Sequence, residues 1–599
     1  MTAIPIFACA LTASLTAGWF RDGTETSSVG VPQGCACRKS VDGDAERWTL
    51  VNTSRVEVAF QRGSFGVRFP FDNCFEGKTN KLATTCISHV WCGGELAWIV
   101  SGKADGMRPR LVCELERGSV TSYGTEADMS RAKVGASYRG DIILYADDAN
   151  LKPGERLELA FRWSLADDFP PTPRVSTCSP FVGETFTVEG RPCSFDTPGE
   201  RVLPLVFCGK RTFVRVNVLR PFDDILFRRA KFITTDQQCL DESRPEYGAY
   251  LIRDNRTGRL VVGPSDDHNA GRERLAMGAV VAMALQRRKD EAMMRSLELH
   301  RRFVERELFD AATATVYNDV GRNNRWHRRY NYPWMAAYYL EWFRLTDDHQ
   351  CLERAADIML SYYEKLDGAA QESHVTLVPD IIDLLDRVGD AARFLRLRKA
   401  FVAHADSILV RSGKSVSREV NWANGMVSMM GIVLSRAHLM TGEARYLDGA
   451  RRVCPLVEAF SGIQPDYRLN GQAVRYWDGF WFGGACAYGD TMPQWVSAQL
   501  AEFDRWYGLA SKTDRSVRME ENLRGGLCVF SEMGAAAAAA YPALTMRTYV
   551  GNGGGDGWRN GSGKFVTGET LDVWANDQDW SLYYAVLYLR PKICGGEAP

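Results

Sequence analysis

The sequence lacks the short motifs that mark several common chemistries. It contains no His-Glu-x-x-His, no Gly-x-Ser-x-Gly, no EF-hand loop and no Gly-x-Gly-x-x-Gly that follows a strand. These absences disfavour metalloproteases, serine hydrolases, calcium sensors and dinucleotide-binding enzymes. An excess of positive charge is missing too, because 73 Lys and Arg residues accompany 74 Asp and Glu residues among 599. The chain therefore lacks the electrostatic signature of a nucleic-acid binder.

Cysteines are few for the length and do not have the spacing of metal ligands. The 16 cysteines are spread over the whole chain, and no Cys-x-x-Cys pair occurs among them. This pattern disfavours a disulfide scaffold and a tetrahedral zinc site, and it favours buried thiols in a reducing compartment. We predict that the protein uses no metal and no other cofactor.

The N-terminal residues 4–17 are apolar, but no Lys or Arg precedes them as a signal peptide would require. The stretch is also too short to cross a bilayer, which takes about 20 apolar residues. We therefore expect a cytoplasmic protein without a membrane partner. A periplasmic or secreted location stays open.

The hydrophobic period changes once along the chain. Up to about residue 219, polar and apolar residues alternate in segments such as 48–52 and 156–165, which is typical of half-buried β-strands. Beyond about residue 223 the period is 3.6, and several short links favour antiparallel neighbouring helices. We predict an α+β multidomain protein, with an antiparallel β-sandwich at residues 1–222 followed by an (α/α)6 helical toroid at residues 223–599. The expected helices span residues 272–286, 291–308, 333–345, 351–366, 381–386, 393–409, 425–440, 444–460, 493–509, 516–524 and 578–589.

A dense polar cluster occurs where a predicted hairpin turns into a helix. Because ionisable side chains gathered at a helix entrance suit acid/base chemistry, we predict a functional site here. A structural alternative is that the acids only cap the helix and interact with its dipole. Capping alone would not require a histidine and an amide as well. The cluster contains Asp267, His268, Asn269, Arg272 and Glu273.

An aromatic and basic segment, residues 326–334 (WHRRYNYPW), lies at the entrance of the next long helix. Flat rings stack on the C–H faces of sugars, and a guanidinium binds a carboxylate through two parallel hydrogen bonds. Arg328 and Arg329 would therefore suit a uronic acid, with Tyr332 and Trp334 beside it. The alternative is that both aromatic residues pack in the core.

Two further links carry aromatic residues together with acids. The first contains Glu419 and Trp422 just before a predicted helix, and the second, residues 461–490, is rich in glycine. An exposed Trp is unfavourable unless something stacks on it, so a long link of this composition indicates a substrate site. The candidates in the second link are Trp477, Asp478, Tyr488 and Asp490.

Three segments of the second half resemble a known family. Residues 481–493 (WFGGACAYGDTMP), 518–530 (RMEENLRGGLCVF) and 574–580 (WANDQDW) resemble the bacterial six-hairpin glycosidases. The resemblance extends over roughly residues 223–589, with a preceding β-sandwich as the expected partner domain. Within this superfamily the nearest likeness is to the exo-β-glucuronidases of gut bacteria.

The resemblance implies hydrolysis of a glycosidic bond beside an acidic sugar, in particular a β-glucuronide at a glycan terminus. Hydrolysis of this kind needs one carboxyl group that stays protonated and one that stays ionised. The candidates for this pair are Asp267, Glu273, Glu419, Asp478 and Asp490. The implied partner is an oligosaccharide or glycoside, and the residues expected to bind it are His268, Asn269, Arg272, Arg328, Arg329, Tyr332, Trp334, Trp422, Trp477 and Tyr488.

Two other functions remain open at this point. A polysaccharide lyase on the same fold would remove the proton next to a uronate carboxylate, and Tyr332, His268 and Asn269 could serve it. A non-catalytic glycan-binding protein would need the aromatic residues but not the acids. The sequence does not determine the linkage that is recognised, or whether the chain forms a homo-oligomer.

Overall fold

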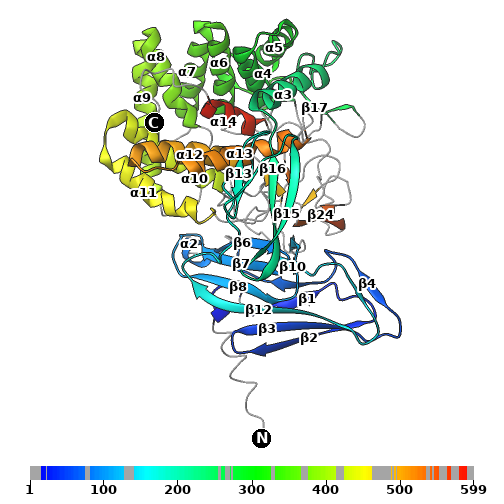
Figure 1. Cartoon of the computed structure of the whole chain (residues 1–599). Helices are drawn as coiled ribbons and strands as arrows, with labels where there is room; N and C mark the ends of the chain where they lie inside the picture. Colours follow the sequence, from blue (N-terminus) through cyan, green and yellow to red (C-terminus); the bar gives the residue numbers. More distant parts are fainter. Residues whose placement is uncertain are drawn as a thin grey trace. The chain divides into compact units, whose positions relative to one another are not determined.

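The computed structural model divides the chain into two compact units (Figure 1). The sandwich unit comprises Met1–Val218, Pro455–Pro493 and Ala540–Asp572, and the helical unit comprises Leu219–Cys454, Gln494–Ala539 and Val573–Pro599. The division at residues 222 and 223 stays a prediction. The structure describes residues 15–21, 23–73, 81–126, 141–253, 258–262, 270–271, 274–324, 331–365, 375–412, 424–461, 487–488, 491–493, 495–533, 540–542, 546–551, 563–567 and 579–589.

Two large sheets build the sandwich unit. One has six antiparallel strands in the order β2-β3-β12-β8-β7-β6, and the other has the order β1-β5-β10-β9-β24-β21 with β25 beside β24. All neighbours are antiparallel except β24, which runs parallel to β9. The bounds are β1 Ser27–Val29, β2 Cys35–Asp42, β3 Ala45–Asn52, β5 Gly66–Phe69, β6 Cys86–Gly93, β7 Leu96–Lys103, β8 Arg110–Arg117, β9 Ser122–Glu126, β10 Asp141–Tyr145, β12 Arg156–Ala166, β21 Ala487–Tyr488, β24 Met546–Gly551 and β25 Gly563–Thr567.

The two sheets share one hydrophobic core. Trp48 and Leu50 of β3 alternate with more exposed neighbours, and they belong to the same buried cluster as Phe69 and Leu144 of the other sheet. Because period-two side chains from both sheets meet in one cluster, the sheets pack face to face as a sandwich. The β-rich N-terminal region is thus confirmed.

The six-stranded sheet is also covered on its second face. Two hairpins, β13–β14 and β15–β16, contribute Phe186, Val188, Val214 and Val216 to a second buried cluster with Trp98 of β7. All eight residues of β6 are consequently buried, so this strand shows no alternation of polar and apolar residues. The hairpin strands are β13 Phe186–Val188, β14 Arg191–Cys193, β15 Gly199–Phe207 and β16 Lys210–Val218.

The helical unit contains the helices α3 to α14, eleven of which lie close to the ranges expected from sequence. The exception is α3, at residues that the periodicity did not predict as a helix. One expected helix, 291–308, is α-helical to Phe303 and then continues as the π-helical segment η2, Val304–Leu308. The bounds are α3 Phe222–Asp236, α4 Leu275–Arg287, α5 Glu291–Phe303, α6 Asn331–Thr346, α7 His349–Glu364, α8 Val378–Val388, α9 Ala391–Arg411, α10 Asn424–Thr441, α11 Ala444–Glu458, α12 Trp495–Ser511, α13 Ser516–Met533 and α14 Trp580–Leu589.

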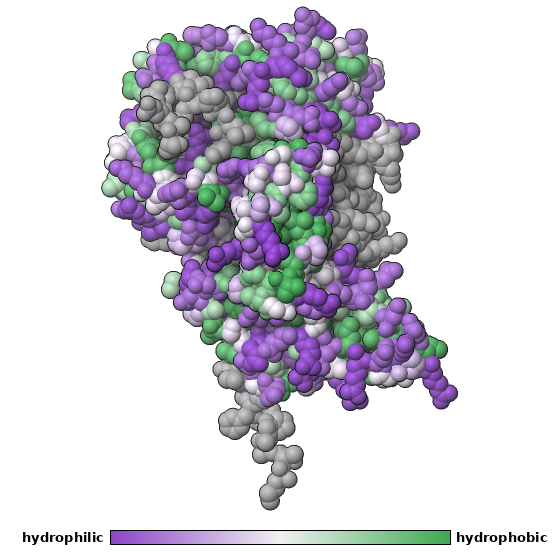
Figure 2. Space-filling model, viewed as in Figure 1, coloured by the Kyte–Doolittle hydropathy of each residue, from purple (hydrophilic) through white to green (hydrophobic). Residues whose placement is uncertain are grey.

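The even-numbered helices other than α8 are more deeply buried than the odd-numbered ones. Every residue of α4 from Leu275 to Leu285 is buried, whereas α5 and α7 each bury one side and expose the other. Among the even-numbered helices, α4 contacts α6, α12 contacts both α10 and α14, and α14 returns to α4. Helices α4, α6, α10, α12 and α14 are therefore the inner ones, and hydrophilic residues are frequent on the surface of the helical unit in Figure 2. No helix in the described part of the chain is both long and apolar enough to span a membrane.

Candidate active site

Several even-numbered helices run in the same direction as an even-numbered neighbour. Gln286 donates to Glu341 (3.0 Å) near the C-terminal ends of α4 and α6, and Gln499 donates to Ser428 (3.0 Å) near the N-terminal ends of α12 and α10. At the N-terminal ends of α6 and α14, Trp334 stacks on Trp580 with a centroid distance of 5.1 Å. Contacts between matching ends show that α4 runs parallel to α6, α6 to α14, and α10 to α12, so the N-termini within each of these pairs lie near each other.

Short and long links lie at opposite ends of the even-numbered helices. Short links leave the C-terminal ends of the even-numbered helices, at residues 288–290, 347–348, 389–390, 442–443 and 512–515. Long links precede the even-numbered helices, at residues 237–274, 309–330, 365–374, 412–423, 459–494 and 534–579. Long connecting segments at one end of a scaffold are where binding and catalytic residues concentrate. The N-terminal ends of these helices, with the links that belong to the helical unit, are therefore the candidate active site, whereas residues 455–493 and 540–572 belong to the sandwich unit.

The residues predicted from sequence fall on these long links or on the first turn of α6, but most lie outside the described residues. The five carboxylates Asp267, Glu273, Glu419, Asp478 and Asp490 are all outside them. Tyr488 belongs to β21, and its side chain is not described. Their roles stay predictions. The other binding candidates that lie outside the described residues are His268, Asn269, Arg272, Arg328, Arg329, Trp422 and Trp477.

Tyr332 and Trp334 begin α6 and point to different neighbours. The Tyr332 hydroxyl accepts a hydrogen bond from Lys365 Nζ (2.9 Å), and its ring lies 6.3 Å from that of Tyr362 on α7. Trp334 instead stacks on Trp580 of α14. Two residues apart on a helix, the side chains face nearly opposite sides. Tyr332 is 2% exposed and Trp334 6%, so Tyr332 joins α6 to α7 while Trp334 faces the inner helices.

A small cavity lies among the helices α6, α8, α10, α12 and α14. Its volume of about 20 Å³ holds roughly one water molecule, whereas ligand pockets measure about 300–1,000 Å³. A sugar ring does not fit there, so the cavity belongs to the interior that supports the site. Its lining comprises Trp334, Ala337, Thr376, Leu377, Asp380, Arg436, Glu502, Trp580, Tyr583, Tyr584 and Leu587.

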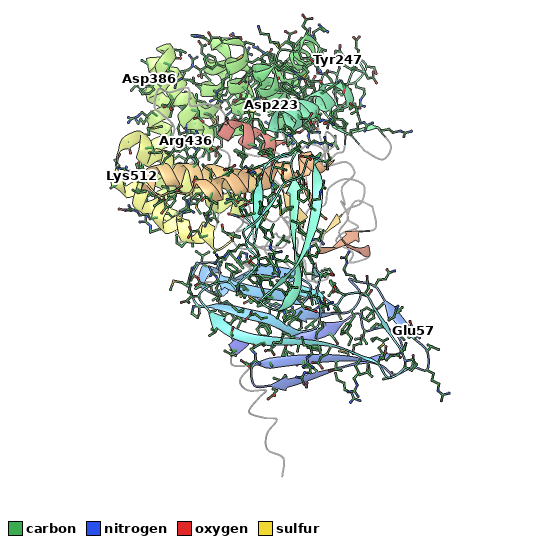
Figure 3. All side chains as sticks on the ribbon, viewed as in Figure 1. Glu57, Asp223, Tyr247, Asp386, Arg436 and Lys512 are labelled. Carbon is green, nitrogen blue, oxygen red and sulfur yellow. The ribbon has the colours of Figure 1, made fainter. Side chains whose placement is uncertain are left out.

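An ion pair between α10 and α8 borders this cavity. Arg436 of α10, within the helical unit in Figure 3, donates to both Asp380 oxygens of α8 at 2.8 and 3.1 Å. It also donates to the Thr376 carbonyl at 2.5 Å, in the short 3₁₀-helix η3, Val375–Leu377, that leads into α8. The guanidinium lies 4.1 Å from the ring centroid of Trp506. Arg436 therefore fixes the start of α8, where a long link enters.

A second carboxyl group at the cavity, that of Glu502 on α12, has a pKa that shifts in the direction opposite to that of Asp380. It accepts a hydrogen bond from Trp506 Nε1 at 2.8 Å. Burial raises the pKa of Glu502, while Arg505 and Arg436 oppose that shift. Burial also pushes the pKa of Asp380 upward, but Arg436, with Arg344 and Arg505, lowers it overall. The surroundings thus shift the pKa values of the two carboxyl groups in opposite directions, downward for Asp380 and upward for Glu502.

Sequence reasoning did not identify Asp380, Arg436 or Glu502. The available signal was an isolated charge within an apolar helical stretch, as with Arg436 in GIVLSRAHLM. A charge in such a position needs a buried partner. The partner sits on another helix, so local sequence does not reveal it.

The first residue before α14 makes a fully buried ion pair. Asp579 accepts hydrogen bonds from Arg229 Nε (2.6 Å) and Nη2 (2.7 Å) of α3, and the two side chains are 0% and 1% exposed. The pair joins the first helix of the unit to the last. Asp579, within the segment 574–580, therefore has a structural role.

The described part of the chain contains no group of three or more His, Cys, Asp or Glu side chains that could hold a metal ion. Its cysteines are free thiols, and seven of the twelve are buried. Burial raises the pKa of the Cys113 thiol well above its usual range, which keeps that thiol unreactive.

Comparison with known proteins gives matches only among solved structures. No protein-family model matches the sequence, and no curated protein matches it. The polysaccharide lyase BACCELL_00875 superposes with a TM-score of 0.81 and 25% sequence identity, covering 93% of this chain and 87% of the lyase. This chain therefore shares its fold with that lyase over nearly its whole length.

Two other solved structures match more weakly. A family 76 glycoside hydrolase from a bovine Bacteroides thetaiotaomicron strain has a TM-score of 0.38 and 8% identity, covering 84% of this chain and 99% of the hydrolase. A sugar epimerase from a ruminal bacterium has a TM-score of 0.41 and 10% identity, covering 63% of this chain and 99% of the epimerase. These two superpositions are too poor to indicate the fold or the function of this chain.

Proposed function

We propose that this protein is a carbohydrate-active enzyme, and specifically a polysaccharide lyase that cleaves a uronate linkage by β-elimination. The observation that carries the proposal is the superposition on a polysaccharide lyase across both units, with a TM-score of 0.81 and 25% identity. The resemblance to six-hairpin glycosidases first suggested hydrolysis of a β-glucuronide, but the lyase match favours elimination. We further propose that α3 to α14 form an (α/α)6 toroid.

In this proposal, the long links supply the reacting groups. A base removes the proton on the carbon next to the uronate carboxylate, and the bond from the neighbouring carbon to the glycosidic oxygen breaks. A C=C bond forms in the new terminal sugar, and the leaving oxygen takes up a proton to become a hydroxyl group of the other product. Arg328 and Arg329 carry the charge that pairs with the substrate carboxylate, and Asn269 adds a hydrogen bond. His268 is our candidate for the base, because the Tyr332 hydroxyl is already bonded to Lys365 between α6 and α7.

A glycoside hydrolase acting on a β-glucuronide is the second candidate function. The observation in its favour is that Asp380 and Glu502, whose pKa values shift in opposite directions, line one cavity. That cavity is too small for a sugar, however, so a hydrolase would have to use carboxylates of the long links, with Asp267, Glu273, Glu419, Asp478 and Asp490 as candidates. As a glycan enzyme, the protein would need neither nucleic acid nor membrane as a partner, and we propose a cytoplasmic location.

The two functions give different products. Uronic-acid polymers treated with the purified protein should gain the ultraviolet absorbance of a 4,5-unsaturated uronate, and each cleavage should proceed without uptake of water. Release of 4-nitrophenol from its β-glucuronide without any unsaturated product would instead establish a hydrolase. If neither product appears, the protein binds glycans without cleaving them or uses another substrate, and the lyase proposal is wrong.

A pair of histidine variants tests the assigned base. His268→Ala should lower the elimination rate by about 100-fold or more, since general base catalysis typically contributes 10²–10⁴-fold. His349→Ala provides the control, because His349 is an exposed residue at the start of the outer helix α7. An equal effect of both substitutions would contradict the assignment of His268.

A further inference from the structure

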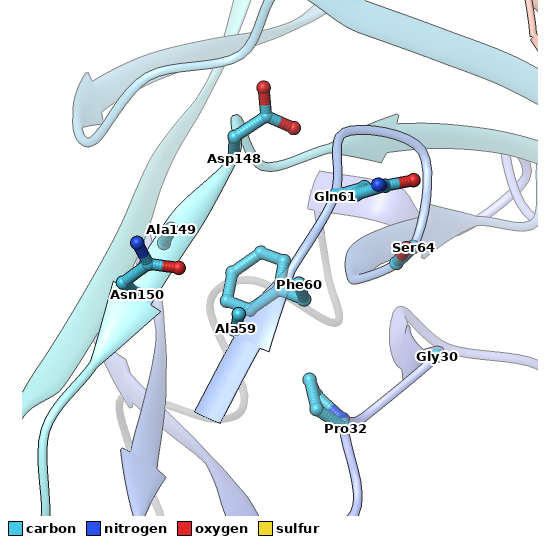
Figure 4. A pocket seen from close by; sticks show the side chains of 9 residues that line it. All are labelled: Gly30, Pro32, Ala59, Phe60, Gln61, Ser64, Asp148, Ala149 and Asn150. Atoms are coloured by element: carbon cyan, nitrogen blue, oxygen red, sulfur yellow. The ribbon is translucent and has the colours of Figure 1, made fainter. Parts of the chain in front are cut away.

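A groove in the sandwich unit lies beside the short strands β4, Val58–Phe60, and β11, Ala149–Leu151 (Figure 4). The two strands pair antiparallel, with Ala149 opposite Phe60 and Asn150 opposite Ala59. The groove encloses about 760 Å³, within the range of about 300–1,000 Å³ that is typical of small-molecule sites. We call it the β4–β11 groove, and its lining comprises Gly30, Pro32, Ala59, Phe60, Gln61, Ser64, Asp148, Ala149 and Asn150.

The floor of the β4–β11 groove is apolar and fixed. Phe60 lies in the middle of the lining residues in Figure 4, and it is 8% exposed. Its ring meets that of Phe65 edge to face at 6.1 Å, and both belong to the main core of the sandwich. Because Phe60 is held by the core, the floor keeps its shape without a ligand.

The wall of the groove requires a glycine. Gly30 has a φ of +63°, and a Cβ built there would lie 1.9 Å from the Ser64 carbonyl oxygen. Only glycine allows the chain at residue 30 to approach the turn at residue 64 this closely. Two segments far apart in sequence are thus locked together as one side of the groove.

Polar groups surround this apolar floor. Gln61, Asp148 and Asn150 are exposed and Ser64 is half-buried, so amide donors, amide acceptors, a hydroxyl and a carboxylate face the same space. Asp148 accepts a hydrogen bond from the Arg62 backbone N–H, which orients its carboxylate. An apolar surface flanked by mixed donors and acceptors matches a sugar, which combines C–H faces with hydroxyl groups.

The charge of the groove selects among sugars. In the part of the lining that the structure describes, Asp148 is charged and there is no Lys, Arg or His. A carboxylate without a cation repels uronate, sulfate and phosphate groups. The site therefore differs in chemistry from the arginine-bearing link of the proposed active site.

We propose that the β4–β11 groove binds a neutral saccharide unit and serves the enzyme as a second, non-catalytic glycan site. The inference rests on the proposed function in one respect, namely that the natural ligand is a neutral part of the same glycan. A neutral unit of a mixed polymer held on the sandwich unit would raise the local concentration of uronate linkages for the helical unit.

The test measures binding and cleavage separately. Isothermal titration calorimetry is performed on the full chain with the neutral hexaoses of glucose, mannose, galactose and xylose, and with an oligouronate. We expect at least one neutral hexaose to bind to the wild type. The variant Gln61→Ala/Asn150→Ala should bind it about tenfold more weakly, as expected for the loss of one or two hydrogen bonds.

Two further variants make the result specific. Ala59→Arg places a long side chain in the groove and should abolish binding of the neutral hexaose, whereas Gln350→Ala, at an exposed amide on α7, should leave it unchanged. Cleavage of a short oligouronate should be the same in all variants. The proposal is overturned if no neutral hexaose binds at millimolar concentration, or if the groove variants bind it as the wild type does. Failure of the lyase assay alone would refute the proposed function and leave this binding result intact.

Discussion

The buried pair Arg229–Asp579 leads to a quantitative prediction about stability. Replacing Arg229 with Met removes the partner of a carboxylate that is 0% exposed and accepts two hydrogen bonds at 2.6 and 2.7 Å. Breaking a buried ion pair by removing one partner costs about 3–5 kcal/mol, because the remaining charge is left without compensation. We therefore expect Arg229→Met to lower the free energy of unfolding of the helical unit by that amount, measured by urea unfolding monitored through Trp fluorescence.

The neighbouring residue on α3 provides a matched control. Arg228 pairs with Asp224, but the two side chains are 53% and 39% exposed, and such i,i+4 pairs contribute about 0.3–0.5 kcal/mol. Arg228→Met should therefore change stability little. A double variant, Arg229→Met/Asp579→Leu, removes both charges and should recover most of the loss. The reasoning is refuted if the Arg229 and Arg228 variants lose the same stability, or if the double variant is no better than Arg229→Met.

Two pH-dependent predictions follow from the buried titratable groups. Burial raises the pKa of Glu502, so the native state favours its protonated form, and stability falls as the pH rises above the ordinary value of 4.5. Glu502→Gln keeps a hydrogen-bond acceptor for Trp506 and should not show this decline. Its free energy of unfolding in urea, relative to that of the wild type, should therefore be more favourable at pH 8 than at pH 4.5. The same difference at both pH values would contradict the pKa shift. Burial lowers the pKa of His89 from 6.5 to about 4, so stability should be full above pH 6.5 and fall by up to about 3 kcal/mol as the pH drops to 4. His89→Gln should remove that part of the pH dependence, and a profile identical to the wild type would refute its origin in His89.

Most helices could be predicted because their periodicity and their caps agree. Asp290, Asp348 and Asp390 accept hydrogen bonds from backbone N–H groups at the starts of α5, α7 and α9, and each lies in a short polar link. The links with Asp290 and Asp348 follow the buried helices α4 and α6, and all three links precede amphipathic helices. The local sequence therefore indicates where these helices begin and that each has one exposed side.

Helix α3 was not predicted because a buried charge interrupts its apolar pattern, and buried charges inside the helical unit were not predicted for the same reason. Arg229 occupies its buried stripe, between Leu226 and Ile233, and a charge there interrupts the apolar pattern. What makes this position compatible with burial is Asp579, 350 residues away. Arg436 and Asp380 are likewise paired across different helices, so their contribution becomes visible only in three dimensions.

Strands buried on both faces were difficult for a related reason. β6 has no polar face, because hairpins β13–β14 and β15–β16 cover the side that would otherwise meet solvent. Alternation predicts a strand only where one side is exposed. The candidate residues at the active site were predicted by composition instead, and along the chain they lie before or at the start of α4, α6, α10 and α12.

The uneven links of the helical unit have a consequence for how this protein can diversify. At one end, the connections of residues 347–348, 389–390 and 442–443 leave almost no freedom for insertion, since added residues would disturb the packing of neighbouring helices. At the opposite end, extra residues can be accommodated at little cost in free energy. Grafting experiments that aim to change substrate preference should therefore exchange segments such as 365–374 and 412–423, and leave the turns at the other end untouched.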